Sequence, residues 1–325
     1  PMINPDQHKI PTGIDPHKTA SELIEGINLS GKNAIVTGGY SGIGVETVRA
    51  LAAAGARVTV PARNLDKARK NLTDVKGEIE IANMDLVDLA SVRKFAEGYC
   101  ENDAELHLLI NNAGIMACPM DHTPTGWESQ FGVNHLGHMA LTLGLLPALR
   151  RAKGARVVCL SSTGHAIGGI HWDDPHFQSH DYDKWQAYGQ SKTANALFAV
   201  GLDTREKTNG IRAFAVHPGG IMTDLQRHLS VDEMAALGWL DEDGNLSERA
   251  RSMFKSPAAG AATSVFAATS PLLDGKGGLY CEDSDVANLA DEDSPRYRDV
   301  RDYAVDTDNA DRLWDMSIKM LKDAA

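Results

Sequence analysis

Short apolar runs alternate with longer helical stretches along most of the chain, and this alternation limits the folds open to it. Six runs bounded by Gly, Asn, Asp or Ser occur at residues 33–36, 57–60, 78–82, 106–110, 156–160 and 212–216. Continuous apolar runs of this length are typical of strands buried on both faces of a parallel sheet. The stretches at 43–54, 65–72, 89–99, 126–151 and 184–206 are long enough for right-handed helical crossovers. We therefore expect an α/β fold with a doubly wound parallel sheet.

The composition allows one large domain and argues against polyanionic partners. Hydrophobic residues make up 42% of the 325 residues, which is enough for the core of a single α/β unit. The net charge is -12 and the pI about 5.4, whereas a nucleic-acid or anionic-membrane surface needs a basic footprint. We expect no nucleic-acid partner and a small-molecule substrate.

The spacing of the cysteines and the composition of residues 1–18 bear on the cellular compartment of the protein. Cys100, Cys118, Cys159 and Cys281 lie far apart without Cys-x-x-Cys spacing, so we expect reduced thiols in a cytoplasmic protein. Residues 1–18 are polar and proline-rich, and no apolar stretch approaches membrane-spanning length. We expect a soluble protein without a membrane partner.

We divide the chain into an N-terminal extension (1–30), a main Rossmann-type domain (31–285) and a C-terminal helical extension (286–325). Segments 165–187 and 224–256 interrupt the strand–helix alternation, and long excursions at a sheet's active edge often serve as substrate lids. Four aromatic side chains in these segments could line an apolar pocket or anchor the loops against the core: Trp172, Phe177, Trp185 and Trp239. An apolar pattern from Trp314 to Leu321 predicts a docked terminal helix.

The segment Thr37-Gly-Gly-Tyr-Ser-Gly-Ile-Gly44 lies between the first expected strand and the first expected helix. The missing side chains of Gly38, Gly42 and Gly44 would let backbone amides approach a pyrophosphate at the positive end of that helix. A tight turn without a ligand is the alternative for this motif alone. The dinucleotide interpretation also places Tyr40, Ser41 and Ile43 beside the cofactor.

The end of the second strand bears on cofactor choice. A NAD-binding fold usually carries an acidic residue there for the ribose hydroxyls, whereas this chain has Arg63, 19 residues past Gly44 (63 − 44). A guanidinium can pair with a 2′-phosphate, and a solvated arginine is the alternative. We expect NADP(H), with NAD(H) less favoured.

The candidate acid/base group is in Tyr188-Gly-Gln-Ser-Lys192. This motif alone is weak, since a chain with 7 tyrosines should contain roughly 0.3 copies of Tyr-x-x-x-Lys by chance. A free tyrosine has a pKa near 10, and an ammonium one helical turn away could stabilise its phenolate. Ser162, with Ser161 as its near rival, could hydrogen-bond a substrate carbonyl oxygen. A strand-to-loop turn is the alternative for this serine pair, and a packing amide is the alternative for Asn134.

Taken together, the motifs resemble those of the classical short-chain dehydrogenases/reductases in identity and order: Thr37–Gly44, Asp85-Leu86, Asn111-Asn-Ala-Gly114, Asn134, Ser162, Tyr188-x-x-x-Lys192 and Pro218-Gly-Gly-Ile-Met-Thr223. The resemblance covers roughly residues 29–281. The segments Ala20–Lys32 and Pro61-Ala-Arg-Asn64 are most similar to the retinol-dehydrogenase and WW-domain-oxidoreductase branch, which commonly uses NADP(H).

The resemblance implies a role for each matched residue. Tyr188 would exchange a proton with the substrate oxygen, Ser162 would polarise that oxygen, and Lys192 would lower the tyrosine pKa and hold the nicotinamide ribose. Asn134 would order a water in the proton relay. The cofactor would be contacted by Asp85 and Leu86 near adenine, Asn112, Ala113 and Gly114 near the adenosine ribose, and Pro218, Gly219, Ile221 and Thr223 near the nicotinamide.

Two features depart from the family pattern. Ser162 and Tyr188 are 26 residues apart (188 − 162), about twice the usual interval, and segment 165–187 fills the difference. The N-terminal apolar anchor of membrane-bound relatives has no counterpart in residues 1–30.

Histidines outside these motifs have simpler interpretations. Those of segment 165–187 have no compact metal-ligand spacing, so we expect a hydrogen-bonded loop and no metal. For His135 and His138 we expect packing or interface roles. The expected helices 126–151 and 184–206 pair subunits in related enzymes, which makes a homo-oligomer an open expectation.

The leading hypothesis is an NADP(H)-dependent carbonyl reductase or alcohol dehydrogenase acting on a hydrophobic ketone or aldehyde and its alcohol. Two alternatives stay open. One is an epimerase or dehydratase that retains its cofactor, and the other is a non-enzymatic NADP-binding sensor.

Overall fold

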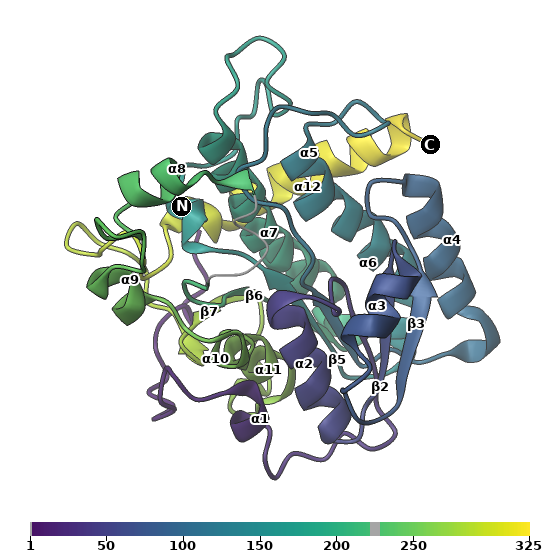
Figure 1. The fold of residues 1–325 in the computed structure, drawn as a ribbon. Helices are drawn as coiled ribbons and strands as arrows, with labels where there is room; N and C mark the ends of the chain where they lie inside the picture. The colour runs from purple at the N-terminus through teal and green to yellow at the C-terminus, as the bar shows by residue number, and fades with distance from the viewer. Residues whose placement is uncertain (1, 222–227) are drawn as a thin grey trace.

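A computed structural model describes residues 2–221 and 228–325 of the chain (Figure 1). Its centre is an eight-stranded sheet in the order β3-β2-β1-β4-β5-β6-β7-β8, parallel except for β8, which runs antiparallel to β7. The strands are β1 Asn33–Val36, β2 Arg57–Ala62, β3 Ile79–Asn83, β4 Leu108–Asn111, β5 Ala155–Leu160, β6 Ile211–His217, β7 Leu279–Glu282 and β8 Asp285–Val286. The six expected strands and the doubly wound parallel sheet are confirmed. The two edge strands β7 and β8 were not predicted.

Helices cover both faces of the sheet. One face packs against α4 (Leu89–Tyr99), α6 (His138–Arg151), α7 (Lys184–Glu206) and α12 (Thr307–Asp323). The other packs against α1 (Ala20–Leu23), α2 (Gly42–Ala53) and α11 (Ala262–Thr269). The shorter helices are α3 (Leu65–Asn71), α5 (Ser129–Phe131), α8 (Val231–Ala236), α9 (Glu248–Met253) and α10 (Pro257–Gly260). Each face of the sheet therefore has its own apolar core.

The helix expected at residues 126–151 is wrong in two respects. It begins only at Ser129, because the Glu128 carboxylate accepts the N–H groups of Gln130 and Phe131 at 2.8 and 2.7 Å and so caps the helix. It then passes through a π-helical turn at Gly132–Gly137 before α6 begins. A single wide turn of this kind inside a helix often marks a functional site.

The C-terminal helix α12 packs along α7, which confirms the docked terminal helix. The Trp314 ring stacks on Phe198 with centroids 5.7 Å apart and an interplanar angle of 8°. Arg205 of α7 lies over the same Trp314 ring and pairs with Asp311. The part of α7 that contacts α12 is therefore covered within the chain.

Residues near the N-terminus cover the antiparallel edge of the sheet. The Gln7 side chain donates to the carbonyls of Tyr280 and Ala287 at 2.9 and 2.8 Å and accepts the Tyr280 N–H at 2.9 Å. This segment thus satisfies backbone groups beside a strand edge that would otherwise be open to pairing.

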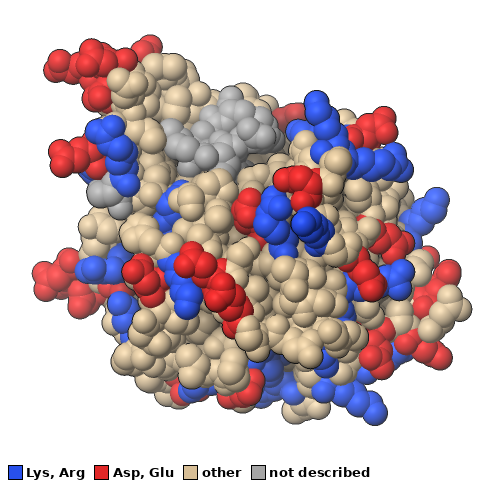
Figure 2. All heavy atoms as spheres, turned by 60° about the horizontal axis from the view of Figure 1, so that its bottom comes forward, with Lys and Arg blue, Asp and Glu red and all other residues tan. Residues whose placement is uncertain are grey.

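Surface charge and helix composition bear on the partners expected from the sequence. The face in Figure 2 carries basic and acidic side chains interspersed, without a continuous basic area. No helix in the described ranges is both long and apolar enough to cross a membrane.

Candidate active site

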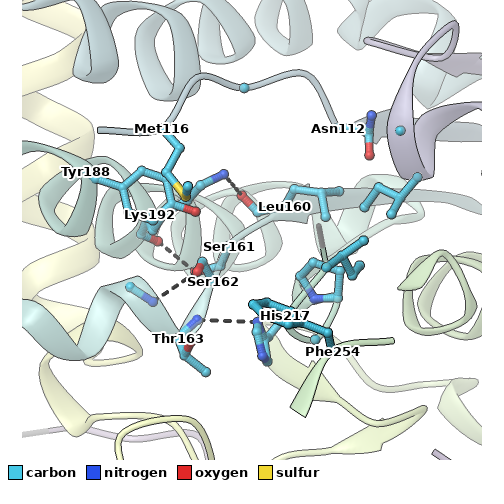
Figure 3. A pocket seen from close by; sticks show the side chains of 18 of the residues that line it. Asn112, Met116, Leu160, Ser161, Ser162, Thr163, Tyr188, Lys192, His217 and Phe254 are labelled. Atoms are coloured by element: carbon cyan, nitrogen blue, oxygen red, sulfur yellow. Dashed lines mark hydrogen bonds between the residues drawn. The ribbon is translucent and has the colours of Figure 1, made fainter. Parts of the chain in front are cut away.

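A cavity of about 1050 Å³ opens at the carboxyl ends of the central strands, where ligands bind in open α/β sheets (Figure 3). Most predicted site residues line it: Gly38, Tyr40, Ser41, Gly42, Ile43, Arg63, Asn112, Ala113, Gly114, Ser162, Tyr188, Lys192, Pro218, Gly219 and Ile221. Gly44, Asp85, Leu86 and Asn134 do not line it, and Thr223 lies outside the described residues.

The N-terminus of α2 faces one end of the cavity without a side-chain cap. Ser41 makes no capping hydrogen bond, whereas Asn64, Asp88 and Asp183 cap α3, α4 and α7. The first amides of a helix need acceptors, and the positive end of the helix dipole favours anions. This end of the cavity therefore suits a phosphate group.

Gly44 is needed for the turn rather than for ligand contact. A Cβ at this position would lie 2.0 Å from the Gly38 carbonyl oxygen, which is backbone and cannot rotate away. Gly38 has φ +62° and packs closely against the loop that follows β4. A Cβ on Gly38 would lie 2.9 Å from Ala113 Cα in that loop. The glycines thus let the loop fold back onto α2 and against the residues after β4.

Asn112 offers an acceptor at the same end. Its side-chain N–H donates to the Thr37 carbonyl at 3.0 Å and its backbone N–H donates to Thr37 Oγ1 at 2.9 Å. Its Oδ1 is buried and has no hydrogen-bond partner within the described residues. An unpaired buried acceptor is costly, and a ligand hydroxyl would satisfy it. The residues present therefore fit a dinucleotide.

Two basic side chains line the cavity near the end of β2. Arg63 is exposed and makes no salt bridge within the described ranges. Lys67, in the first turn of α3, lines the same cavity and was not singled out from the sequence. Asp85 lies elsewhere in a turn, where its carboxylate accepts the Val87 N–H at 3.1 Å.

Tyr188 and Lys192 lie one turn apart on α7, as expected. The Lys192 Nζ is 5.7 Å from the centroid of the Tyr188 ring and donates to the Leu160 carbonyl at 3.3 Å. Burial raises the pKa of Tyr188 to about 12, against the opposing effect of a hydrogen bond with Ser162. Burial also lowers the pKa of Lys192 to about 8. The tyrosine pKa thus moves opposite to the expected direction, because removing the phenolate from water outweighs the hydrogen bond with Ser162.

The two serines after β5 have different surroundings. Ser161 Oγ donates to the Lys192 carbonyl at 2.8 Å, so this buried hydroxyl holds β5 against α7. Ser162 Oγ accepts the Gly164 N–H at 2.9 Å and lies on the Tyr188 side of the cavity (Figure 3). The tyrosine ring fits beside this turn because Gly164 has no side chain, whose Cβ would lie 2.6 Å from Tyr188 Cε2. The geometry therefore favours Ser162 over Ser161.

Asn134 lies in the π-helical turn and is fully buried. Its side chain accepts the Ile115 N–H and donates to the Ile115 carbonyl, both at 2.9 Å, and it donates to Ser191 Oγ at 2.9 Å. Ser191 is on α7 between Tyr188 and Lys192. The Asn134 side chain thus clamps the segment after β4 onto the helix that carries the tyrosine.

The other end of the cavity is largely apolar. Its lining includes Met116, Ile167, Trp185, Leu237, Trp239, Met253 and Phe254. Both predicted lid segments contribute, and the Lys184 ammonium in one is paired with the Glu233 carboxylate in the other. Of the four aromatics considered from sequence, Trp185 and Trp239 line the cavity, whereas Trp172 lies under Arg312 and Phe177 is buried in its loop.

Several lining residues were not singled out from the sequence, among them Arg296, Tyr297 and His217. Arg296 and Tyr297 come from the C-terminal extension, and no local motif marks them. His217 ends β6 directly before Pro218, a strand-end position that could have identified it. Its Nδ1 is 3.3 Å from the Thr163 N, and burial lowers its pKa to about 3, so it accepts that N–H as a neutral ring.

The histidine-rich segment is the expected hydrogen-bonded loop. The Asp174 carboxylate accepts the N–H groups of Gln178, Ser179 and His180 at 2.8 to 3.0 Å, and His180 Nδ1 lies 2.6 Å from it. The hydrogen bond from the His180 ring has the largest effect, and together with the backbone hydrogen bonds it holds the pKa of Asp174 well below its usual range.

Comparisons with known proteins agree with this site. The family profile described as short chain dehydrogenase matches residues 32–234. A probable oxidoreductase of Streptomyces lividans is 45% identical over 89% of this chain and 97% of its own length. Human retinol dehydrogenase 12 is 37% identical over 91% of this chain and 88% of its own length. The solved Pseudomonas aeruginosa RhlG/NADP active-site complex is 25% identical, with a TM-score of 0.60 over 78% of this chain and 95% of that one. The resemblance to the retinol-dehydrogenase branch is confirmed, and the chain belongs to the short-chain dehydrogenase/reductase family.

Proposed function

We propose that the protein is an NADP(H)-dependent oxidoreductase that interconverts a hydrophobic ketone or aldehyde and its alcohol. One observation carries the proposal: Ser162, Tyr188 and Lys192 meet in a cavity that also receives the uncapped N-terminus of α2. A proton-transfer group and a phosphate-binding helix end thus share one space.

The residues at the α2 end would hold the cofactor. The amides of Gly42 and Ile43 would bind the pyrophosphate, and Asn112 Oδ1 would accept a ribose hydroxyl. Arg63 and Lys67 would pair with a 2′-phosphate, a choice supported by the NADP in the RhlG complex. When bound, the nicotinamide supplies or accepts the hydride.

The proton would come from Tyr188. During reduction its hydroxyl donates a proton to the carbonyl oxygen as hydride reaches the carbon, and the Ser162 hydroxyl donates a hydrogen bond to the same oxygen. The pKa of about 12 keeps Tyr188 protonated at neutral pH, the state required of an acid. The Lys192 ammonium, 5.7 Å from the ring centroid, would stabilise the phenolate left behind.

The apolar end would receive the body of the substrate. Met116, Trp239 and Phe254 offer contacts to a hydrophobic group, and the similarity to retinol dehydrogenase 12 is consistent with such a substrate.

The test is NADPH oxidation by the purified protein across aromatic, steroidal, retinoid and aliphatic carbonyls, with Tyr188→Phe beside wild type. Loss of a general acid costs on the order of 100-fold or more, so Tyr188→Phe should lose at least that factor in kcat. Tyr297→Phe is the matched control, because Tyr297 lines the same cavity but is exposed, and it should stay within about twofold.

Other outcomes would overturn the proposal. Near-normal turnover by Tyr188→Phe would remove the tyrosine from the mechanism. Tight NADPH binding without consumption would favour an epimerase or dehydratase that retains its cofactor, or an NADP-binding sensor.

A further inference from the structure

His138 is a buried histidine outside the cavity lining that connects the two halves of the site. It is the first residue of α6 and makes one hydrogen bond with each ring nitrogen. We propose that His138 is a positioning residue that couples the dinucleotide-binding loop to the turn carrying Asn134. The catalytic part of this inference rests on the proposed function, whereas its cofactor-binding part can be tested without turnover.

The first hydrogen bond reaches the dinucleotide end. His138 Nε2 lies 2.8 Å from Thr37 Oγ1, at the start of the glycine-rich loop. Thr37 Oγ1 also accepts the backbone N–H groups of Asn112 and Ala113, at 2.9 and 3.0 Å. One hydroxyl therefore joins the residues after β1 to those after β4. The Ile110 carbonyl also lies 3.5 Å from Thr37 Oγ1, so the nearer His138 Nε2 is the acceptor that sets the orientation of this hydroxyl.

The second hydrogen bond reaches the proton-transfer end. His138 Nδ1 lies 3.0 Å from the Asn134 carbonyl oxygen in the π-helical turn. The Asn134 side chain in turn holds Ile115 and Ser191, next to Tyr188 and Lys192. Moving the Asn134 backbone would therefore shift the clamp on α7.

One arrangement of protons satisfies this network. A carbonyl only accepts, so His138 Nδ1 must carry the proton, and Nε2 must then accept the Thr37 hydroxyl proton. That leaves the lone pairs of Thr37 Oγ1 for the two backbone amides. Burial lowers the pKa of His138 to about 4, which keeps the ring neutral at physiological pH. The chain thus fixes both the tautomer of His138 and the direction of the Thr37 hydroxyl.

His135 lies three residues earlier and provides a matched control. It is equally buried, but its Nε2 bonds Ser317 of α12 at 2.8 Å and its Nδ1 has no partner in the described residues. Its ring belongs to the packing of the C-terminal helix and makes no hydrogen bond to Thr37 or Asn134 within the described residues. A purely structural effect of losing a buried histidine should appear at both positions.

Two substitutions separate the two hydrogen bonds. The amide of asparagine approximates the position of Nδ1, so His138→Asn keeps the bond to Asn134 and loses the one to Thr37. The amide of glutamine approximates the position of Nε2, so His138→Gln does the reverse. We expect His138→Asn to weaken NADPH binding about tenfold with kcat within threefold, and His138→Gln to lower kcat about tenfold with NADPH affinity within threefold.

A double-mutant cycle tests the Thr37 connection. Thr37→Val should weaken NADPH binding at least as much as His138→Asn does, because it also removes the acceptor of two backbone amides, and the double variant should lose little more than Thr37→Val alone. Additive losses would show that the two side chains act separately and would overturn the coupling. His135→Asn should lower the melting temperature while leaving kcat and NADPH affinity within twofold of the wild-type values.

The outcomes distinguish this inference from the proposed function. If no carbonyl is turned over, quenching of protein fluorescence by NADPH still measures the Thr37 half of the coupling. If wild type turns over carbonyls but both His138 variants change only the melting temperature, as His135→Asn does, His138 is a packing residue and the inference is wrong.

Discussion

The two ends of the cavity are built in different ways. The dinucleotide end comes from Thr37–Gly44 and from residues directly after β2 and β4. Its contacts all involve backbone: the glycines bring backbone atoms close together, and the hydrogen bonds between Asn112 and Thr37 join a side chain of one to a backbone group of the other. The substrate end comes from segments 163–187, 228–256 and 296–297, which are distant in sequence. Its segments meet through side chains, such as the Trp239 and Phe254 rings, 5.4 Å apart.

This difference has a consequence for tolerance to change. A backbone atom cannot move away from an added side chain, whereas an exposed side chain can adopt another rotamer. The dinucleotide end should therefore respond steeply to small substitutions. The substrate end should respond weakly, and mainly in which substrates it accepts.

The largest expected effect is at Gly44. Gly44→Ala would place a Cβ 2.0 Å from the Gly38 carbonyl oxygen. Overpacking against a fixed backbone costs about 3 kcal/mol, so NADPH affinity, measured by fluorescence titration, should fall about 100-fold or the protein should be markedly destabilised. Gly168→Ala, in segment 163–187, is the control, because its Cβ would meet no atom within 4 Å. Equal losses in the two variants would contradict the comparison.

The next effect concerns Arg63. Arg63→Glu would place a carboxylate where a 2′-phosphate is expected, and charge-assisted hydrogen bonds contribute about 1.5–3 kcal/mol. NADPH binding should weaken by a factor of about 10 to 100, while NADH binding should change by less than about threefold. Arg69→Glu on α3, the helix that follows Arg63, is the control, since Arg69 pairs with Asp66 and does not line the cavity. Equal losses of NADPH and NADH would remove the phosphate assignment.

The dinucleotide end was largely predictable from sequence because its geometry is local. Gly38 and Gly42 adopt the left-handed φ values of +62° and +55° that favour glycine, and Arg63 follows its strand directly. Tyr188 and Lys192 were found for the same reason, since a spacing of four in a helix fixes their separation. Periodicity and turn chemistry suffice where partners lie within a few residues.

The remainder depends on contacts between distant segments. Nothing near Arg296 in sequence shows that it reaches the cavity, and the lid segments could be identified only as interruptions. The direction of the Tyr188 pKa shift was missed because burial, which raises it to about 12, arises from the whole fold. The π-helical turn at Gly132–Gly137 depends on close packing, since a Cβ at Gly137 would lie 2.7 Å from the Leu86 carbonyl oxygen.

Tyr188 and Lys192 lie where the two ends of the cavity meet, and the rate of the reaction that they support should depend on pH. Burial lowers the pKa of Lys192 to about 8, so its ammonium is lost as the pH rises through that value, whereas Tyr188 stays protonated to about 12. The kcat/KM for NADPH in carbonyl reduction should therefore be flat below pH 7 and fall about tenfold per unit well above pH 8. Lys192→Arg should remove this decrease, because a guanidinium keeps its proton. A decrease unchanged in Lys192→Arg would assign it to another group.

The smallest expected effect lies between the two lids. Lys184→Met removes the charge pair with Glu233, which holds segments 163–187 and 228–256 together over the substrate end. Partly exposed ion pairs contribute about 1 kcal/mol or less, so the KM for a carbonyl substrate should rise about threefold. The KM for NADPH should stay constant, because no backbone of the dinucleotide end depends on this contact. Asp311→Asn is the control, since it breaks the Arg205–Asp311 pair between α7 and α12 and should move neither KM. If Lys184→Met changed the KM for NADPH as strongly as the KM for the carbonyl, the two ends of the cavity would respond together to a substitution. The two ends would then differ in how they are built but not in how they tolerate change.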